Sequence, residues 1–297
     1  MKKFRVAICF RGLIRTGIEN RKTFSHYFES LGWDIDYFCH TWNYENVAPP
    51  FLESPTAGSD LWNELKERPT STLTTFKVSK FTQIYDFKKF KLQDITDYRN
   101  LDSKNVNYPN DEFVMHFHPQ FISCYEVNKL KSEYENENNF KYDLVINTRP
   151  DIVFNPMLID NTIEDMKSIL NNPKNYFGIS SLQSGWTYED NFFDDICYTA
   201  GSDNMNLFCE YYNPSTNLEY HNFIGKYAKK VGLEIVNVDT GYAILRNYLS
   251  FFCPIEEFDE IFIGNLLLYF APDLIEEILK ANKHLTNAYE NAYRNIV

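Results

Sequence analysis

The chain has 297 residues, a formal net charge of -12 and a hydrophobic content of 44%. This length suffices for one large α/β domain, alone or with a helical annex, and for a substantial buried core. The net negative charge disfavours a protein that binds nucleic acid by neutralising many phosphates, so nucleic acid is a less favoured partner.

The cysteines and the N-terminus indicate the compartment. Six cysteines show neither a CxxC spacing nor the Cys/His spacing of a metal site, which predicts reduced and mostly buried thiols. Lys2 and Lys3 lead directly into an apolar strand, and no stretch approaches the roughly 18 apolar residues of a membrane span. We therefore expect a cytoplasmic protein without a transmembrane segment.

Two strands are predicted near the N-terminus. Residues 4–10, FRVAICF, are predicted as a strand that stops at Arg11 and Gly12, and a helix-compatible stretch follows over about 16–31. A second strand over about 35–39 also ends in polar and aromatic residues, namely His40, Thr41 and Trp42. Because both strands deliver such groups at their carboxyl ends, a pocket is predicted there.

The residues at these strand ends suggest an anionic ligand. Arg11, Gly12 and Arg15 could hold a diphosphate through a backbone turn and two guanidinium groups, although two arginines after a strand are also common on ordinary surfaces. His40 and Trp42 could bond to and stack on a nucleobase or sugar, or could simply close the edge of the sheet. For each of these two groups of residues, the ligand-binding role and the purely structural role both stay open at this point.

The segment over residues 43–110 is weakly patterned. It is rich in prolines at its start, and a strand is predicted around 74–78. His116 and His118 alternate as they would on a strand, and a solvated strand face is favoured over a metal site because no third ligand follows. Residues 119–137 show helical spacing, with Pro119 placed in the first turn, where proline is tolerated.

The most informative stretch is YDLVINTRPDIVF, residues 142–154. Its apolar run predicts a buried strand, and Pro150 ends the strand because it lacks an N–H. Arg149 and Asp151 then lie beyond a carboxyl end, where open α/β sheets bind their ligands. A cation and a carboxylate at this place indicate an anionic substrate with a metal, or else an ion pair that caps a strand.

Strands and helices continue to alternate after this stretch. Helices are expected over 161–170, 204–212, 218–231 and 271–290, with Asp203 capping the second, and strands over 176–181 and just before Ala200. Asp190, Asp194 and Asp195 lie in an acidic loop, where one of them could serve as a general base, although charged loops are usually only solvated. The alternation predicts a mostly parallel sheet flanked by helices.

These motifs occur together in one order: FRVAICFRGLIR, the DYFCHTW strand end, Gln120 with Ser123, the TRPD strand end and TAGSDNMNLF. The ordered set resembles the GT-A-like glycosyltransferases of bacterial polysaccharide clusters and of large viruses and phages. It covers most of residues 4–230. The resemblance implies a GT-A-like, Rossmann-type domain over 1–253 and a helical C-terminal extension over 254–297 packed on it. For a viral protein, the cytoplasm would be that of the host cell.

The resemblance also implies an activity, the transfer of a sugar from a nucleotide-diphosphate donor to a glycan or another hydroxyl acceptor. The nucleotide would be held by Arg11, Gly12, Arg15, His40, Thr41, Trp42, Gln120, Arg149 and Asp151. TRPD stands where the family has its DxD motif, so the side chain of Arg149 takes the place of one of the two carboxylates. Asp151 is the candidate ligand for Mn²⁺ or Mg²⁺. The catalytic residues would be Arg149, for the leaving diphosphate, and Asp194 or Asp195.

Two rival functions remain at this stage. A phage enzyme that glycosylates modified DNA bases would need a basic face, which the net charge of -12 opposes. A glycan- or nucleotide-binding module without turnover would explain the missing second carboxylate in TRPD. The donor sugar, the acceptor and the oligomeric state are not indicated by the sequence.

Overall fold

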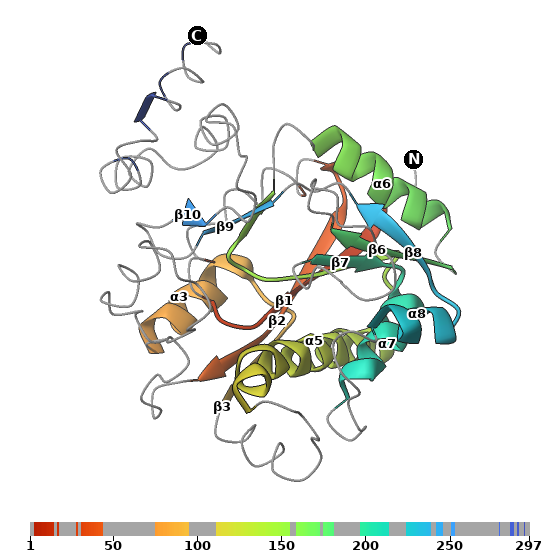
Figure 1. Ribbon diagram of the computed structural model, residues 1–297, viewed down its shortest axis with the longest axis horizontal. Coiled ribbons are helices and arrows are strands. Elements are labelled where there is room, and N and C mark those ends of the chain that lie inside the picture. The colour runs from red at the N-terminus through yellow and green to blue at the C-terminus, as the bar shows by residue number, and fades with distance from the viewer. Residues whose placement is uncertain are drawn as a thin grey trace.

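The computed structural model describes residues 3–14, 17, 28, 31–43, 75–94, 111–154, 159–172, 175–180, 197–213, 224–238, 242–245 and 251–252, and single helical residues at 279, 286, 287, 290 and 294. Its centre is a seven-stranded sheet with the order β3-β2-β1-β4-β7-β6-β8 (Figure 1). The strands are β1 (Arg5–Arg11), β2 (Asp34–Asn43), β3 (Lys89–Asp94), β4 (Leu144–Thr148), β6 (Tyr176–Ser180), β7 (Cys197–Ala200) and β8 (Glu234–Val238).

The sheet is mostly parallel. β1 pairs in parallel with β2 on one side and with β4 on the other, and the β2–β3 and β6–β8 pairs are also parallel. Only β7 runs against its two neighbours, β4 and β6. A second, antiparallel sheet has the order β10-β9-β5, formed by β5 (Ile152–Phe154), β9 (Tyr242–Leu245) and β10 (Phe251–Phe252).

Side chains alternate along β1 between two apolar clusters, because successive residues of a strand point to opposite faces. Val6, Ile8 and Phe10 join a cluster that includes residues of α3 (Thr75–Tyr85) and α6 (Ile159–Asn171). Ala7 and Cys9 join a cluster with residues of α5 (Asp111–Asn138), α7 (Ser202–Cys209) and α8 (Ile224–Lys230). Helices therefore cover both faces of the sheet, as Figure 1 shows.

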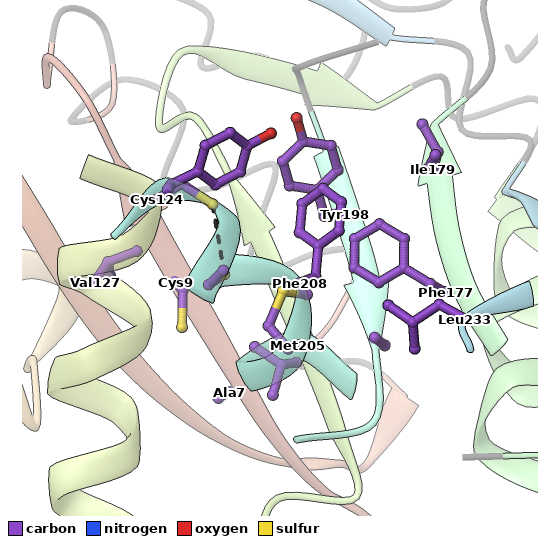
Figure 2. Packing of buried hydrophobic residues seen from close by; sticks show 14 of the residues in the cluster. Ala7, Cys9, Cys124, Val127, Phe177, Ile179, Tyr198, Met205, Phe208 and Leu233 are labelled. Atoms are coloured by element: carbon purple, nitrogen blue, oxygen red, sulfur yellow. Dashed lines mark hydrogen bonds between the residues drawn. The ribbon is translucent and has the colours of Figure 1, made fainter. Parts of the chain in front are cut away.

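Aromatic rings fill much of the second cluster. Phe177 of β6 stacks on Phe208 of α7, with ring centroids 4.0 Å apart, and Tyr198 of β7 meets Phe208 edge-on at 4.9 Å. Figure 2 shows these three rings side by side next to Met205. Each such pair contributes about 0.5–1.5 kcal/mol of stability beyond the effect of its buried area. The pairs therefore hold α7 against β6 and β7.

The fold class predicted from the sequence is confirmed, since the sheet is mostly parallel and flanked by helices. The helices expected at 119–137, 161–170, 204–212 and 218–231 correspond to α5, α6, α7 continued by the 3₁₀ turn η4 (Glu210–Tyr212), and α8. The domain boundary at residue 253 stays a prediction, because nearly all of 254–297 lies outside the described residues.

Three local predictions were wrong. Residues 75–85 form α3 rather than a strand, because Val78, Phe81 and Tyr85 recur at helical spacing and pack on the first cluster. Residues 111–118 belong to α5, so His116 and His118 are not on a strand and Pro119 is not in the first turn of the helix. The N-cap of α7 is Gly201, which makes no side-chain capping bond, and not Asp203.

Candidate functional site at the carboxyl ends of β1, β2 and β4

The strand order reverses between β1 and β4. From β1 the chain adds β2 and β3 on one side of the sheet and returns to place β4 on the other. The last register pair, Phe10 with Thr148, brings Arg11 and Arg149 to neighbouring strand ends. In open α/β sheets, this switch point is where ligands bind. The two arginines selected from the sequence therefore lie where this fold places its sites.

Arg149 and Asp151 form a bidentate ion pair. Arg149 donates from Nε to Oδ1 of Asp151 at 2.8 Å and from Nη2 to Oδ2 at 2.7 Å. Asp151 is fully buried and Arg149 is 8% exposed. Pro150, between them, ends the pairing of β4 and turns the chain toward β5. The pair is thus a rigid, nearly buried unit at the strand exit.

Arg11 is the last residue of β1, and its side chain is fully buried. Its guanidinium lies over the ring of Tyr198, with Cζ 4.9 Å from the ring centroid. Tyr198 belongs to the cluster that β1 shares with α5 and α7, so Arg11 extends toward that face of the sheet. A cation–π contact of this kind contributes about 2 kcal/mol when it is shielded from water.

The turn after β1 needs glycine at two positions. Gly12 has φ +86°, a conformation that only glycine adopts readily, and its N–H donates to Oγ of Ser123 at 2.7 Å. At Gly17, an added Cβ would lie 2.7 Å from Cβ of Pro150 and 2.9 Å from Phe81. The segment after β1 therefore packs directly on the TRPD turn.

His40 lies inside the protein and is fully bonded. Its Nδ1 is 2.8 Å from Oγ of Ser123, and its Nε2 is 3.0 Å from Oε1 of Gln93. Burial lowers the pKa of His40 to about 4, while the hydrogen bond to Gln93 opposes that shift. The imidazole is therefore neutral at physiological pH.

The other residues predicted at this strand end lie close to His40. Trp42 is 1% exposed and meets the His40 ring edge-on, with centroids 4.8 Å apart. Thr41 is fully buried between them in the strand, and Gln120 lies half-buried on α5. The contact of His40 and Trp42 with a nucleobase stays a prediction, since in this structure their rings contact each other.

Comparison with known proteins finds a likeness in structure but none in sequence. No protein-family model and no curated protein matches the chain. The chain is similar to a solved structure described as the crystal structure of a glycosyltransferase involved in the glycosylation of the major capsid of PBCV-1. The two are 7% identical over 80% of this chain and 83% of that one, with a TM-score of 0.33.

The described residues do not by themselves form a metal site. Within them, no three His, Cys, Asp or Glu side chains gather closely enough to hold an ion. Both carboxylate oxygens of Asp151 accept hydrogen bonds from Arg149, so the carboxylate selected as a metal ligand already has a cationic partner. The assignment of Mn²⁺ or Mg²⁺ to Asp151 stays a prediction.

Some predicted residues fall outside the described part of the chain, and some contributors were not predicted. Arg15, Asp194 and Asp195 lie outside the described residues. Gln93 was missed because the half-exposed strand β3 was not recognised. Ser123 was noted only as part of the motif order, and nothing in the sequence linked it to Gly12 or His40. No helix in the described part of the chain has both the length and the apolar character needed to cross a bilayer.

Proposed function

We propose that the protein is a glycosyltransferase that moves a sugar from a nucleotide-diphosphate donor to a hydroxyl acceptor of glycan type. The observation that carries the proposal is the placement of two arginines, Arg11 and Arg149, at neighbouring carboxyl ends on either side of the switch point. The carboxylate of Asp151 accompanies Arg149 at this turn. Such a place suits an anionic ligand of diphosphate type.

The reaction is a displacement at the anomeric carbon of the donor sugar. The bond from this carbon to the diphosphate oxygen breaks, and a bond to the acceptor oxygen forms. Negative charge grows on the leaving diphosphate, and positive groups already fixed in place stabilise it without reorganising. Arg149 is the candidate for this task, because Asp151 fixes the plane of its guanidinium through two bonds.

Removal of the acceptor proton is assigned to Asp194 or Asp195. A carboxylate within hydrogen-bond reach of the acceptor hydroxyl would take its proton as the new bond forms. Replacing each aspartate singly by asparagine tests the assignment through the rate of sugar transfer. Full activity in both variants would refute it.

The first experiment is a thermal-shift screen of UDP, GDP, ADP and CDP and their sugar conjugates, with and without Mn²⁺ or Mg²⁺. A ligand that binds only the native state stabilises it, by about 2.7 kcal/mol at a concentration of 100 Kd. We expect one nucleotide to raise Tm and its sugar conjugate to be hydrolysed above background. No shift with any nucleotide would contradict the proposal.

A matched set of variants locates the binding. Arg149→Met should abolish the shift, and Arg149→Met with Asp151→Leu removes the guanidinium without leaving a buried carboxylate unpaired. Arg5→Met is the control, because Arg5 lies at the opposite end of β1, where it contacts Phe140. If the Arg149 variants keep the full shift, the nucleotide binds elsewhere.

A binding module without turnover is the second candidate. The observation that favours it is the full engagement of the Asp151 carboxylate by Arg149, which leaves no described carboxylate at the turn available for catalysis. Such a module would give the thermal shift but would release no nucleotide from the sugar conjugate. The hydrolysis assay therefore separates the two functions.

A further inference from the structure

A chain of three hydrogen bonds connects the turn after β1 to two other strands and a helix. Gly12 N–H donates to Oγ of Ser123 on α5 at 2.7 Å, and this oxygen is 2.8 Å from Nδ1 of His40 on β2. Nε2 of His40 is in turn 3.0 Å from Oε1 of Gln93 on β3. Ser123 and His40 are fully buried, so water does not replace these bonds.

The protons in this chain can be assigned from the groups themselves. Oε1 of Gln93 only accepts, so a neutral His40 carries its proton on Nε2 and presents Nδ1 as an acceptor. The single proton of Ser123 then lies toward His40, whose Nδ1 and carbonyl oxygen are 2.8 Å and 3.0 Å away. A lone pair of the hydroxyl is thereby directed at the Gly12 N–H.

We propose that Ser123 is a positioning residue of the donor site, which holds the turn after β1 in place through the amide of Gly12. The inference rests on the proposed function, since it assigns that turn to the nucleotide diphosphate. An added Cβ at Gly12 would meet nothing within 4 Å, so packing does not hold the turn at this position. The turn then runs through Gly17 onto Pro150, next to Arg149.

The test measures two quantities on the same variants: the exchange rate of the Gly12 amide hydrogen by NMR and the Kd for UDP, GDP, ADP and CDP. Ser123→Ala removes the acceptor of the Gly12 N–H. We expect roughly tenfold faster exchange at Gly12, corresponding to the loss of one hydrogen bond. The Kd for the nucleotide that wild-type protein binds should rise by about the same factor.

Ser132→Ala is the matched control. It is the same replacement in the same helix, and Ser132 donates to Asn206 on α7, away from the turn. Exchange at Gly12 and the nucleotide Kd should both stay at wild-type values in this variant. A change as large as that of Ser123→Ala would mean that any loss in α5 disturbs the turn, and would overturn the proposal.

A pair of His40 variants separates bonding from packing. In His40→Asn, the side-chain oxygen can take the place of Nδ1 as an acceptor for Ser123, whereas in His40→Leu only the backbone oxygen of residue 40 is left to accept from the hydroxyl. We expect Gly12 exchange near the wild-type rate with asparagine, and faster exchange with leucine, although by less than in Ser123→Ala. The opposite order would show that His40 acts only by packing.

The remaining outcomes are also decisive. If Ser123→Ala leaves Gly12 exchange unchanged, Ser123 does not hold the turn. If exchange accelerates while the nucleotide Kd does not move, the turn is not part of the donor site. A wild-type protein that binds none of the four nucleotides refutes the proposed function itself, and the Gly12 exchange rates still decide whether Ser123 fixes the turn.

Discussion

Arg149 and Asp151 depend on each other because both are nearly or fully buried. Replacing one leaves the other as an uncompensated charge, a loss of about 3–5 kcal/mol for a buried pair. We expect Asp151→Asn and Arg149→Met each to lower the free energy of unfolding by several kcal/mol, and the double replacement Arg149→Met with Asp151→Leu to cost much less than their sum. Urea unfolding of all variants measures this coupling, and additive losses would show that the pair is not a unit.

His40 makes stability depend on pH. Its pKa is about 4 in the folded protein, below the ordinary value of 6.5, because burial disfavours the charged ring, while Glu126 and Lys91 act on it with opposite signs. The unfolded chain therefore binds the proton more readily than the folded protein does. The stabilisation is complete above pH 6.5 and is lost as the pH falls from 6.5 to 4.

The expected loss can be isolated by comparison with His40→Asn, which cannot titrate. Relative to that variant, wild-type protein should lose on the order of 3 kcal/mol of unfolding free energy between pH 7 and pH 4. Urea unfolding at both pH values checks it. A constant difference across this range would show that His40 accepts a proton without cost.

At the same scale, the sequence predicted which residues lie at a strand end but not which side chains they contact. The apolar strand and the proline located Arg149 and Asp151 at an exit, and both lie there. The direction of Arg11 toward Tyr198 depends on β7, which lies far along the chain, and therefore could not be predicted. The same holds for the contact between Ser123 and His40, which are 83 residues apart in sequence.

The α5–α7 contact is polar at its centre. Oδ1 of Asn206 accepts from Nδ2 of Asn128 at 2.9 Å, from Nζ of Lys131 at 2.8 Å and from Oγ of Ser132 at 2.8 Å. Lys131 is fully buried and also donates to Glu135 at 3.0 Å. Burial lowers the pKa of Lys131, and the Glu135 carboxylate opposes that shift. Asn206 thus joins the two helices through one atom.

Asn206→Ala removes the acceptor of three donors together. We expect a loss of about 3 kcal/mol in the free energy of unfolding, because buried donors without an acceptor cost about 1–3 kcal/mol each and some regain water. The control is Asn172→Ala, an exposed asparagine whose side chain donates to the backbone oxygen of Ser168, with an expected effect within about 0.5 kcal/mol. Equal losses in the two variants would show that Asn206 contributes no more than a surface residue.

Elements with a clear apolar period were predictable, and edge strands were not. α6 repeats its apolar residues at helical spacing, and Met166 and Ile169 are buried as that pattern requires. β3 and β8 lie at the two edges of the sheet and are only partly buried, so their sequences lack a continuous apolar run. α3 was taken for a strand because threonines and a β-branched valine favour strands locally, while the contacts of Phe81 and Tyr85 decide for a helix.

At the scale of the whole molecule, the thiols in the described part of the chain lie away from solvent. The five described cysteines are buried, and none of them forms a disulfide. The sixth, Cys253, lies outside the described residues. Burial raises the pKa of Cys9, Cys39 and Cys209, so these three residues carry little of the reactive thiolate. Cys124 and Cys209 lie with their sulfur atoms 3.7 Å apart, and Figure 2 marks that contact from Cys124.

We therefore expect a colorimetric disulfide reagent to label at most one thiol of the native protein, that of Cys253, and all six after unfolding in guanidinium. Replacing Cys253 by serine should leave the native protein unlabelled. Rapid labelling of two or more thiols before unfolding would show that the cluster between the sheet, α5 and α7 opens readily.

The place of β7 has a consequence for how the chain assembles during synthesis. β6 precedes β7 in the sequence, yet β7 lies between β4 and β6 in the sheet. β6 therefore cannot join the sheet when it leaves the ribosome, and the apolar edge of β4 stays open until residues 197–200 arrive. A nascent chain stalled before that point exposes an unpaired strand edge that can pair with other chains. Rapid elongation through this stretch, or a chaperone that covers β4, would shorten the time for which this edge is exposed.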